Sequence, residues 1–172
     1  LKLMPGFADR AINAIASVWG LTYNELADDT DVRAAMHDIS ESAAPAFNEA
    51  TPDVDGVYYQ SWAGVSSVLG IANKQDLEAC DGKWLGHEGA YDKMHATLAP
   101  MAAFVAHGTK LYPNDGMVRV TSAKWGEFRG CIPADHLDEV GQPKHNSLDG
   151  HTGFDHVRFY RNIAFELSAN DF

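Results

Sequence analysis

The sequence predicts an α/β protein, because segments with helical periodicity flank a segment typical of a β-strand. Apolar residues recur every three or four positions near the start of the chain and again over residues 154–167. Residues 57–62 are mostly β-branched or aromatic, as in strands. In addition, Asp115 and His136 each lie on a turn after an apolar segment. That arrangement suits polar residues held at the ends of strands.

Length and composition indicate a folded domain, or a large piece of one. The chain has 172 residues, of which 45% are hydrophobic. Its formal charge of −11 would repel nucleic-acid phosphates, which excludes nucleic acid as an expected partner. No apolar run approaches the roughly 20 residues that cross a membrane, so we expect no membrane span.

The first fifty residues predict several helices. Apolar positions place one over residues 11–19, and Thr22 and Glu25 have capping-box spacing for a second. A further helix is expected over residues 32–39, and a further turn or helix over residues 42–48. The apolar face of this region suits either packing on a core or a mobile lid that meets a lipid surface.

After a turn cluster at residues 51–56, the strand over residues 57–62 begins. Residues 70–92 are rich in Gly, Asp and Asn, which predicts loop with at most short helices. Pro100 breaks the next apolar segment, so we expect a short helix and then a strand over residues 102–106.

The remainder of the chain predicts a loop over residues 108–116, a continuation of that loop or a short helical turn over residues 118–123, and a loop or short strand over 130–134. A final helix is expected over residues 154–167. Its predicted buried stripe consists of Val157, Tyr160, Ile163 and Ala164.

Two cysteines, Cys80 and Cys131, allow one disulfide. The bridge would close a loop of about fifty residues and imply an oxidising compartment. The sequence is equally consistent with two reduced, buried thiols.

Asp115 and His136 are the candidate acid and base of a Ser-His-Asp triad, in the order that places the nucleophile first. A turn aspartate and a surface histidine are the alternative interpretation. The sequence contains no Gly-x-Ser-x-Gly segment, and Ser66 and Ser67 lack the second glycine of such a turn, so we expect neither to be the nucleophile.

Oxygen-bearing side chains follow His136 at helical spacing. Asp138 and Gln142 are one turn apart, and the main-chain carbonyl near Asn146 is another turn on. Such hard ligands suit Ca²⁺, which would brace the loop that carries His136, although solvated side chains give the same pattern. A further carboxylate is needed, and Asp92, Asp76 and Asp81 are open alternatives.

Three segments resemble the secreted bacterial true lipases, in the same order along the chain. Residues 57–64 (VYYQSWAG) are similar to a YYSWSG strand, residues 114–118 (NDGMV) to an NDGLV acid turn, and residues 135–142 (DHLDEVGQ) to an NHLDEVNQ base loop. The last match is the most specific. The resemblance covers most of this chain but only the C-terminal portion of the family's domain.

This resemblance implies the C-terminal part of an α/β-hydrolase fold, with residues 1–172 forming a portion of a single domain. Residues 1–50 would form lid- or cap-type helices, and residues 51–172 the C-terminal strands, acid and base loops and final helix. The implied activity is hydrolysis of carboxylic esters in a secreted protein, with an ester or lipid substrate and contact with a lipid interface. Asp115 would be the acid, His136 the base, and a structural Ca²⁺ would take Asp138, Gln142, the carbonyl near Asn146 and Asp92.

The chain also departs from the family. The nucleophilic serine and the oxyanion loop are absent, so we expect a second chain that carries the serine, an incomplete sheet and no activity of this chain alone. The cysteine before the YYSWSG strand is missing, and the insert at residues 124–130 is longer. A non-catalytic, Ca²⁺-stabilised secreted binding domain, a polyester depolymerase or other esterase, and an unrelated α+β protein are the alternatives.

Overall fold

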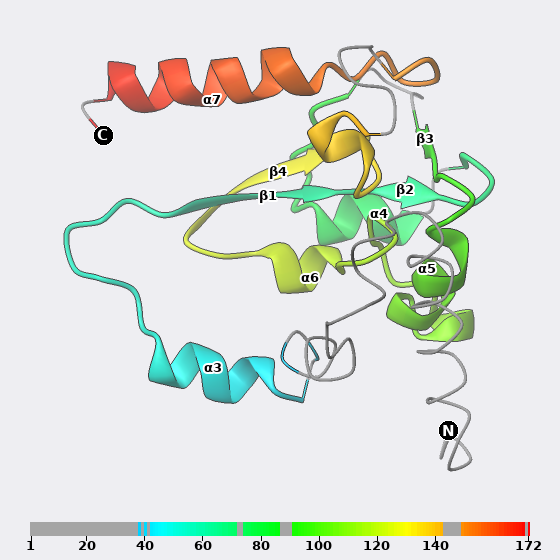
Figure 1. Ribbon diagram of the computed structural model, residues 1–172, viewed down its shortest axis with the longest axis horizontal. Coiled ribbons are helices and arrows are strands. Elements are labelled where there is room, and N and C mark those ends of the chain that lie inside the picture. Colours follow the sequence, from blue (N-terminus) through cyan, green and yellow to red (C-terminus); the bar gives the residue numbers. More distant parts are fainter. Residues whose placement is uncertain are drawn as a thin grey trace, which may run out of the picture. The chain divides into compact units, whose positions relative to one another are not determined.

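The computed structural model describes residues 38, 40, 42–71, 74–86, 91–142, 149–170 and 172 (Figure 1). Contacts within the chain divide it into two units, Leu1–Val57 and Tyr58–Phe172. The helices predicted over residues 11–19, after Thr22 and over residues 32–39 lie outside the described residues, apart from Asp38. The division into lid-type helices and a C-terminal part stays a prediction.

The described part of the first unit contains one helix, α3 (Ala44–Ala50), which is one of the two alternatives, turn or helix, for residues 42–48. Pro45 occupies its first turn, where the missing N–H costs no helical hydrogen bond. At its end the Thr51 hydroxyl donates to the Phe47 carbonyl at 2.7 Å.

The second unit is organised around two parallel strands, β1 (Gln60–Gly64) and β4 (Glu127–Ile132). The sequence placed the first strand three residues too early, at residue 57. On its other edge β4 is bonded to residues 83–85, because Cys131 N donates to Lys83 O at 2.9 Å and Leu85 N donates to Cys131 O at 2.8 Å. Strand β4 therefore lies between two extended segments.

A bulge at Arg129 sets which face of β4 each residue covers. Ser61 pairs with Phe128 and Trp62 with Gly130, so Arg129 has no opposite residue. Gly130 has a φ of +135°, which favours glycine. The extra residue lets Phe128 and Cys131 share one face although they are three positions apart.

Two apolar clusters result. The first cluster contains buried residues of β1 and β4 together with buried residues next to β1, α4 and β3 and in α6: Ala63, Val65, Cys80, Tyr91, Val120, Phe128 and Cys131. The second contains Ile132, Ala134, Phe154 and Phe159, with Trp62 and Ile163 packed against it. Trp62 and Phe159 meet edge to face with ring centroids 5.2 Å apart. Neighbouring residues of β1 thus serve opposite faces, as the pleat requires.

Short elements complete the unit. Strand β2 (Ser66–Ser67) pairs in parallel with β3 (Asp92–Lys93). The helices between the strands are α4 (Lys74–Ala79), α5 (Ala99–Val105), η2 (Gly108–Lys110) and α6 (Val120–Ala123), and η3 (Asp138–Val140) follows β4. Helix α4 agrees with the short helices expected in residues 70–92, and α6 is the helical turn that was one of two alternatives for residues 118–123.

The strand predicted over residues 102–106 is wrong, because α5 continues through these residues. Pro100 lies in the first turn of α5, where proline does not interrupt the helical hydrogen bonds. Met101 and Ala102 are buried, so the alanine-rich stretch forms a helix that packs on the unit.

The final helix, α7 (His156–Ala169), confirms the helix predicted over residues 154–167, but its predicted buried stripe is mostly wrong. Phe159 is buried and Ile163 partly so, whereas Val157 and Tyr160 are 43% and 48% exposed. The helix turns its Phe159 face inward because Trp62 and Phe154 contact that ring. Asp155 caps the helix by accepting a hydrogen bond from Arg158 N at 2.9 Å.

Parallel strands with helices between them are an α/β pattern, and Figure 1 shows β1 and β4 running alongside each other in the second unit. The α/β-hydrolase fold stays a prediction, since the described sheets have two strands each. Among the described residues, no helix has the length and apolar character needed to cross a bilayer.

The structure joins Cys80 to Cys131 in a disulfide, one of the two alternatives that the sequence left open. Both cysteines are completely buried, and the bridge links the end of α4 to β4 across 51 positions of sequence. It therefore fixes β4 a few residues before His136.

Replacing Cys80 and Cys131 with serine should lower the free energy of unfolding by about 4 kcal/mol, because the open chain gains loop entropy in the unfolded state. Urea unfolding of both forms, with and without reductant, measures this. Reductant should weaken the parent protein and leave the double variant unchanged. Equal stability of the two oxidised forms would show that the bridge does not constrain the fold.

Candidate active site

The Asp115 turn is held by its own side chains. Asp115 Oδ1 accepts hydrogen bonds from Met117 N at 2.7 Å and Val118 N at 2.6 Å, and Asn114 Oδ1 accepts one from Gly116 N at 2.8 Å. The Asn-Asp-Gly sequence produces this geometry because Asn and Asp side chains bond the backbone two or three residues on. The Asp115 side chain is only 5% exposed, so its position is well fixed.

His136 meets Asp115 through both backbone and side chain. His136 N donates to Asp115 O at 2.9 Å, and His136 Nδ1 lies 2.8 Å from Asp115 Oδ2. This hydrogen bond raises the pKa of the His136 imidazole above its usual value, against the opposing effect of burial. The ring remains 38% exposed, so it is reachable from solvent.

The other ring nitrogen, Nε2, makes no hydrogen bond within the described part of the chain. The nearby serines of β2 are occupied elsewhere, since Ser66 Oγ donates to Asp92 O at 3.5 Å and Ser67 Oγ to Ile71 O at 3.1 Å. That neither serine is the nucleophile stays a prediction. A carboxylate-oriented imidazole with a free nitrogen can take and return a proton.

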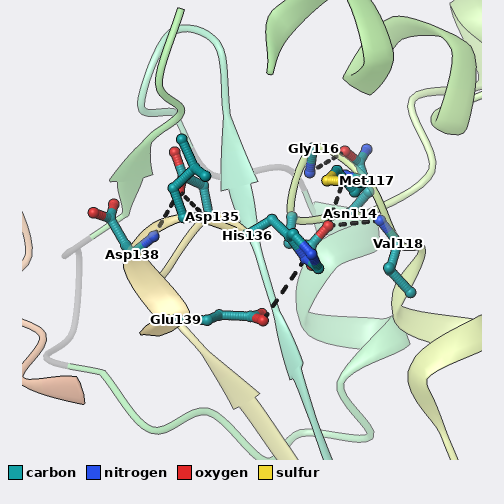
Figure 2. A network of polar contacts seen from close by, with 10 residues as sticks. Asn114, Gly116, Met117, Val118, Asp135, His136, Asp138 and Glu139 are labelled. Carbon is teal, nitrogen blue, oxygen red and sulfur yellow. Dashed lines mark hydrogen bonds and ion pairs between the residues drawn. The ribbon is translucent and has the colours of Figure 1, made fainter. Parts of the chain in front are cut away.

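Glu139 is a third member of this cluster that the sequence interpretation missed, and Figure 2 shows its carboxyl aimed at His136. Its Oε2 lies 3.9 Å from His136 Nδ1. Burial, with the charge of Asp115 acting in the same direction, raises the pKa of Glu139 to about 8. The spacing of three positions on a helical turn was the available signal.

Gly64, at the end of β1, makes room for this carboxyl. A Cβ there would overlap Glu139 Oε1 and the carbonyl oxygen of Ala134. The backbone of Gly64 also hydrogen-bonds the Glu139 carboxyl. The small residue that ends the strand thus determines how closely Glu139 approaches His136.

Asp135 shapes the turn that carries His136 (Figure 2). Its Oδ1 accepts from Leu137 N and Asp138 N at 2.9 Å each, and its Oδ2 accepts from His95 N at 2.6 Å. Asp135 is 1% exposed. The residue before His136 therefore ties the base loop to the segment that follows β3.

Three carboxylates gather beside this turn. One ligand atom each from Asp92, Asp135 and Asp138 lies within 4.8 Å of the others. The Oδ2 atom of Asp92 is buried without a hydrogen-bond partner in the described part of the chain. Burial raises the pKa of Asp92 to about 6, with the charge of Asp135 adding to it.

The structure brings some of the predicted metal ligands together and places others elsewhere. Asp92 and Asp138 come together, and Asp135 joins them although the sequence interpretation did not choose it. Gln142 closes the turn through its N–H, which donates to Leu137 O at 2.8 Å, and Asn146 lies outside the described residues. The alternatives Asp76 and Asp81 lie elsewhere, bonded to Tyr91 and Lys124.

Comparison with known proteins gives a distant lipase-like relation over part of the chain. The chain is 35% identical over 71 residues to triacylglycerol lipase 2 of Saccharomyces cerevisiae, a match that covers 35% of this chain and 22% of that protein. The chain therefore spans about a fifth of the length of the curated relative it matches. No family model matches the chain.

Asp115→Asn should lower the pKa of His136, because the amide keeps the turn bonds but removes the negative charge that favours the imidazolium. A raised histidine pKa adds stability below pH 6.5 that is lost as pH rises through the raised value, so the variant's stability deficit should be largest at acidic pH. NMR titration of the ring and urea unfolding at two pH values measure both effects. Asp81→Asn, at an exposed carboxylate, is the control, and an unchanged His136 pKa would contradict the pairing.

Proposed function

We propose that this chain contributes the acid and base of a serine carboxylic ester hydrolase of lipase type. The observation that carries the proposal is the 2.8 Å contact between His136 Nδ1 and Asp115 Oδ2, with the ring exposed and Nε2 open. The partial similarity to a triacylglycerol lipase supports the same class of reaction. The α/β-hydrolase fold, with its acid and base on loops after strands, is part of the proposal.

Each residue has a defined task in this scheme. Asp115 fixes the tautomer of His136 and stabilises its protonated form. His136 accepts the proton of a serine hydroxyl through Nε2 as that oxygen attacks the ester carbonyl, and then returns it to the leaving alcohol. The same nitrogen activates the water that releases the acid.

The serine comes from residues outside this sequence, either earlier in the same polypeptide or on a second chain. The open Nε2 supports this, as do Val157, Tyr160 and Phe165 of α7, which are 43%, 48% and 76% exposed. Val157 and Tyr160 lie one helical turn apart, and the remaining part of the enzyme would pack on the exposed apolar side chains of this helix. The partner would also supply the N–H groups that hold the oxyanion.

A structural Ca²⁺ fits the cluster of Asp92, Asp135 and Asp138. Calcium takes carboxylate oxygens at about 2.3–2.6 Å, and separations within 4.8 Å allow the three residues to share one ion. The buried Oδ2 of Asp92, which accepts no hydrogen bond from any described residue, supports a cation at this place. When bound, the ion supplies charge neutralisation only; Asp135 and Asp138 hold the turn that positions His136.

The proposed substrate is a carboxylic ester of a lipid, and the proposed location is outside the cell. A buried disulfide suits an oxidising compartment. A Ca²⁺-stabilised binding domain without catalysis is the second candidate, because the carboxylate cluster would serve it equally well.

His136→Ala should lower kcat on a nitrophenyl ester by about 10⁴-fold or more, and Asp115→Asn by about 10³–10⁴-fold. The assay uses the protein together with the residues that supply the serine, and a fluorophosphonate probe locates that serine. His151→Ala, at an exposed histidine, is the matched control.

Retained activity in His136→Ala would contradict the assignment of the base. Absence of probe labelling in every preparation, with binding of lipid retained, would favour the non-catalytic candidate. Full activity of the purified 172-residue chain alone would contradict the external serine.

Addition of Ca²⁺ at a hundred times its Kd should raise the Tm by about 5–10 °C, because binding to the folded state contributes about 2.7 kcal/mol. Calorimetry with and without a chelator measures the shift, and titration calorimetry measures binding directly. Asp92→Asn should abolish both signals, while Asp55→Asn, at an exposed site, should keep them. No binding to the parent protein would exclude the ion.

A further inference from the structure

Charge is distributed very unevenly along this chain. Residues 93–126 carry four Lys or Arg and a single acid, Asp115, so their formal charge is +3 in a chain whose total is −11. Asp115 is buried against His136 and contributes little at the surface. This segment contains α5, η2 and the acid turn, and it presents positive charge in an otherwise acidic protein.

Two of the four cations lie at one aromatic ring, whereas Lys124 is ion-paired with Asp81. Lys110 Nζ lies 5.6 Å and Arg119 Cζ 4.1 Å from the centroid of the Tyr112 ring, and the His107 ring is 5.4 Å away. Lys110 forms no ion pair with any residue in the described part of the chain. Two positive charges are therefore concentrated at one place, without an acidic partner on Lys110.

Exposed apolar side chains accompany these cations. Phe104 of α5 is 55% exposed and Leu111, just after η2, is 59% exposed. Helix α5 and η2 are in contact, and His107 N donates to Phe104 O at 3.0 Å. We call Phe104, Lys110 and Leu111, with the Tyr112 ring and Arg119, the α5–η2 surface.

The backbone of this surface is held in an unfavourable conformation. His107 and Leu111, on either side of η2, have φ values of +54° and +52°. Leucine adopts this left-handed region rarely, and an exposed leucine adds little to folding. Leu111 therefore adopts an unfavourable backbone conformation without contributing much to the core, which indicates that its side chain has a role at the surface.

We infer that the α5–η2 surface docks on an anionic lipid bilayer, with Phe104 and Leu111 inserted among the acyl chains and Lys110 and Arg119 facing the phosphates. The inference rests on the proposed lipase-type function, and it names the surface on which that enzyme works. The overall negative charge does not prevent docking, because charges beyond a Debye length of about 8 Å are screened and the local cations dominate.

The position of the surface suits this task. Leu111 lies four residues before Asp115, and Tyr112 O accepts a hydrogen bond from Asn114 Nδ2 at 2.8 Å. At the other end of the segment, Leu98, at the N-terminus of α5, packs directly beneath Gly116, where an added Cβ would meet it. The turn that carries Asp115 therefore contacts both ends of residues 98–112, the segment that contains Phe104, Lys110 and Leu111.

The test is co-sedimentation of the protein, with any accompanying polypeptide, on vesicles of phosphatidylglycerol and of phosphatidylcholine. We expect stronger binding to phosphatidylglycerol and a decrease with salt. The double variant Lys110→Gln and Leu111→Asn should lower the partition coefficient about tenfold or more. Asparagine tolerates the left-handed backbone, so the variant should keep its fold, which circular dichroism checks.

The matched control removes another exposed leucine and cation, by Leu85→Ser and Arg158→Gln, and should bind as the parent does. Equal binding of the parent to both lipids, or unchanged binding of the double variant, would overturn the inference. Loss of an accompanying polypeptide with lipid binding unchanged would assign the surface to a protein partner and also overturn it. Hydrolysis of a soluble short-chain ester, measured in parallel, tests the proposed activity separately from docking.

Discussion

The buried carboxylate of Asp115 is the constraint on which the site depends. A negative charge that is 5% exposed is costly unless hydrogen bonds and a cation compensate it. Two turn N–H groups satisfy Oδ1, and His136 satisfies Oδ2. The same bonds that stabilise the charge fix the turn, the imidazole and its tautomer, so stability and chemistry have one cause here.

Negative charge accumulates around this centre. Asp92 and Asp135 are each 1% exposed, and Glu139 faces the same imidazole as Asp115. Asp135 is compensated by three backbone N–H groups, whereas Asp92 and Glu139 respond to burial with raised pKa values. Positive charge on His136, and a cation between the carboxylates, would each lower the free energy cost of this buried negative charge.

Local sequence signals predicted the parts of the site that local chemistry controls. The Asn-Asp-Gly turn and the sequence around His136 placed Asp115 and His136 in direct contact, although their catalytic roles stay a prediction. Asp135 and Glu139 were missed because their roles depend on His95 and Gly64, which are distant in sequence. Pro100 misled the assignment of α5, since its effect depends on whether it falls in the first turn or the interior of a helix. The inward face of α7 could not be predicted because its apolar side is broad, and the position of Trp62 decides that Phe159 rather than Val157 or Tyr160 is buried.

The bulge at Arg129 has a consequence for how this chain tolerates changes in length. Because Arg129 is the extra residue of the ladder, its removal would leave a regular strand in which Gly130, Cys131 and Ile132 keep their present partners Trp62, Ala63 and Gly64. Cys131 would still face Cys80, and Ile132 would stay in the cluster that contains Phe159. Loss of one codon at this position would therefore disturb the core less than loss of one codon at a paired position of β4, which would turn the later side chains to the opposite face.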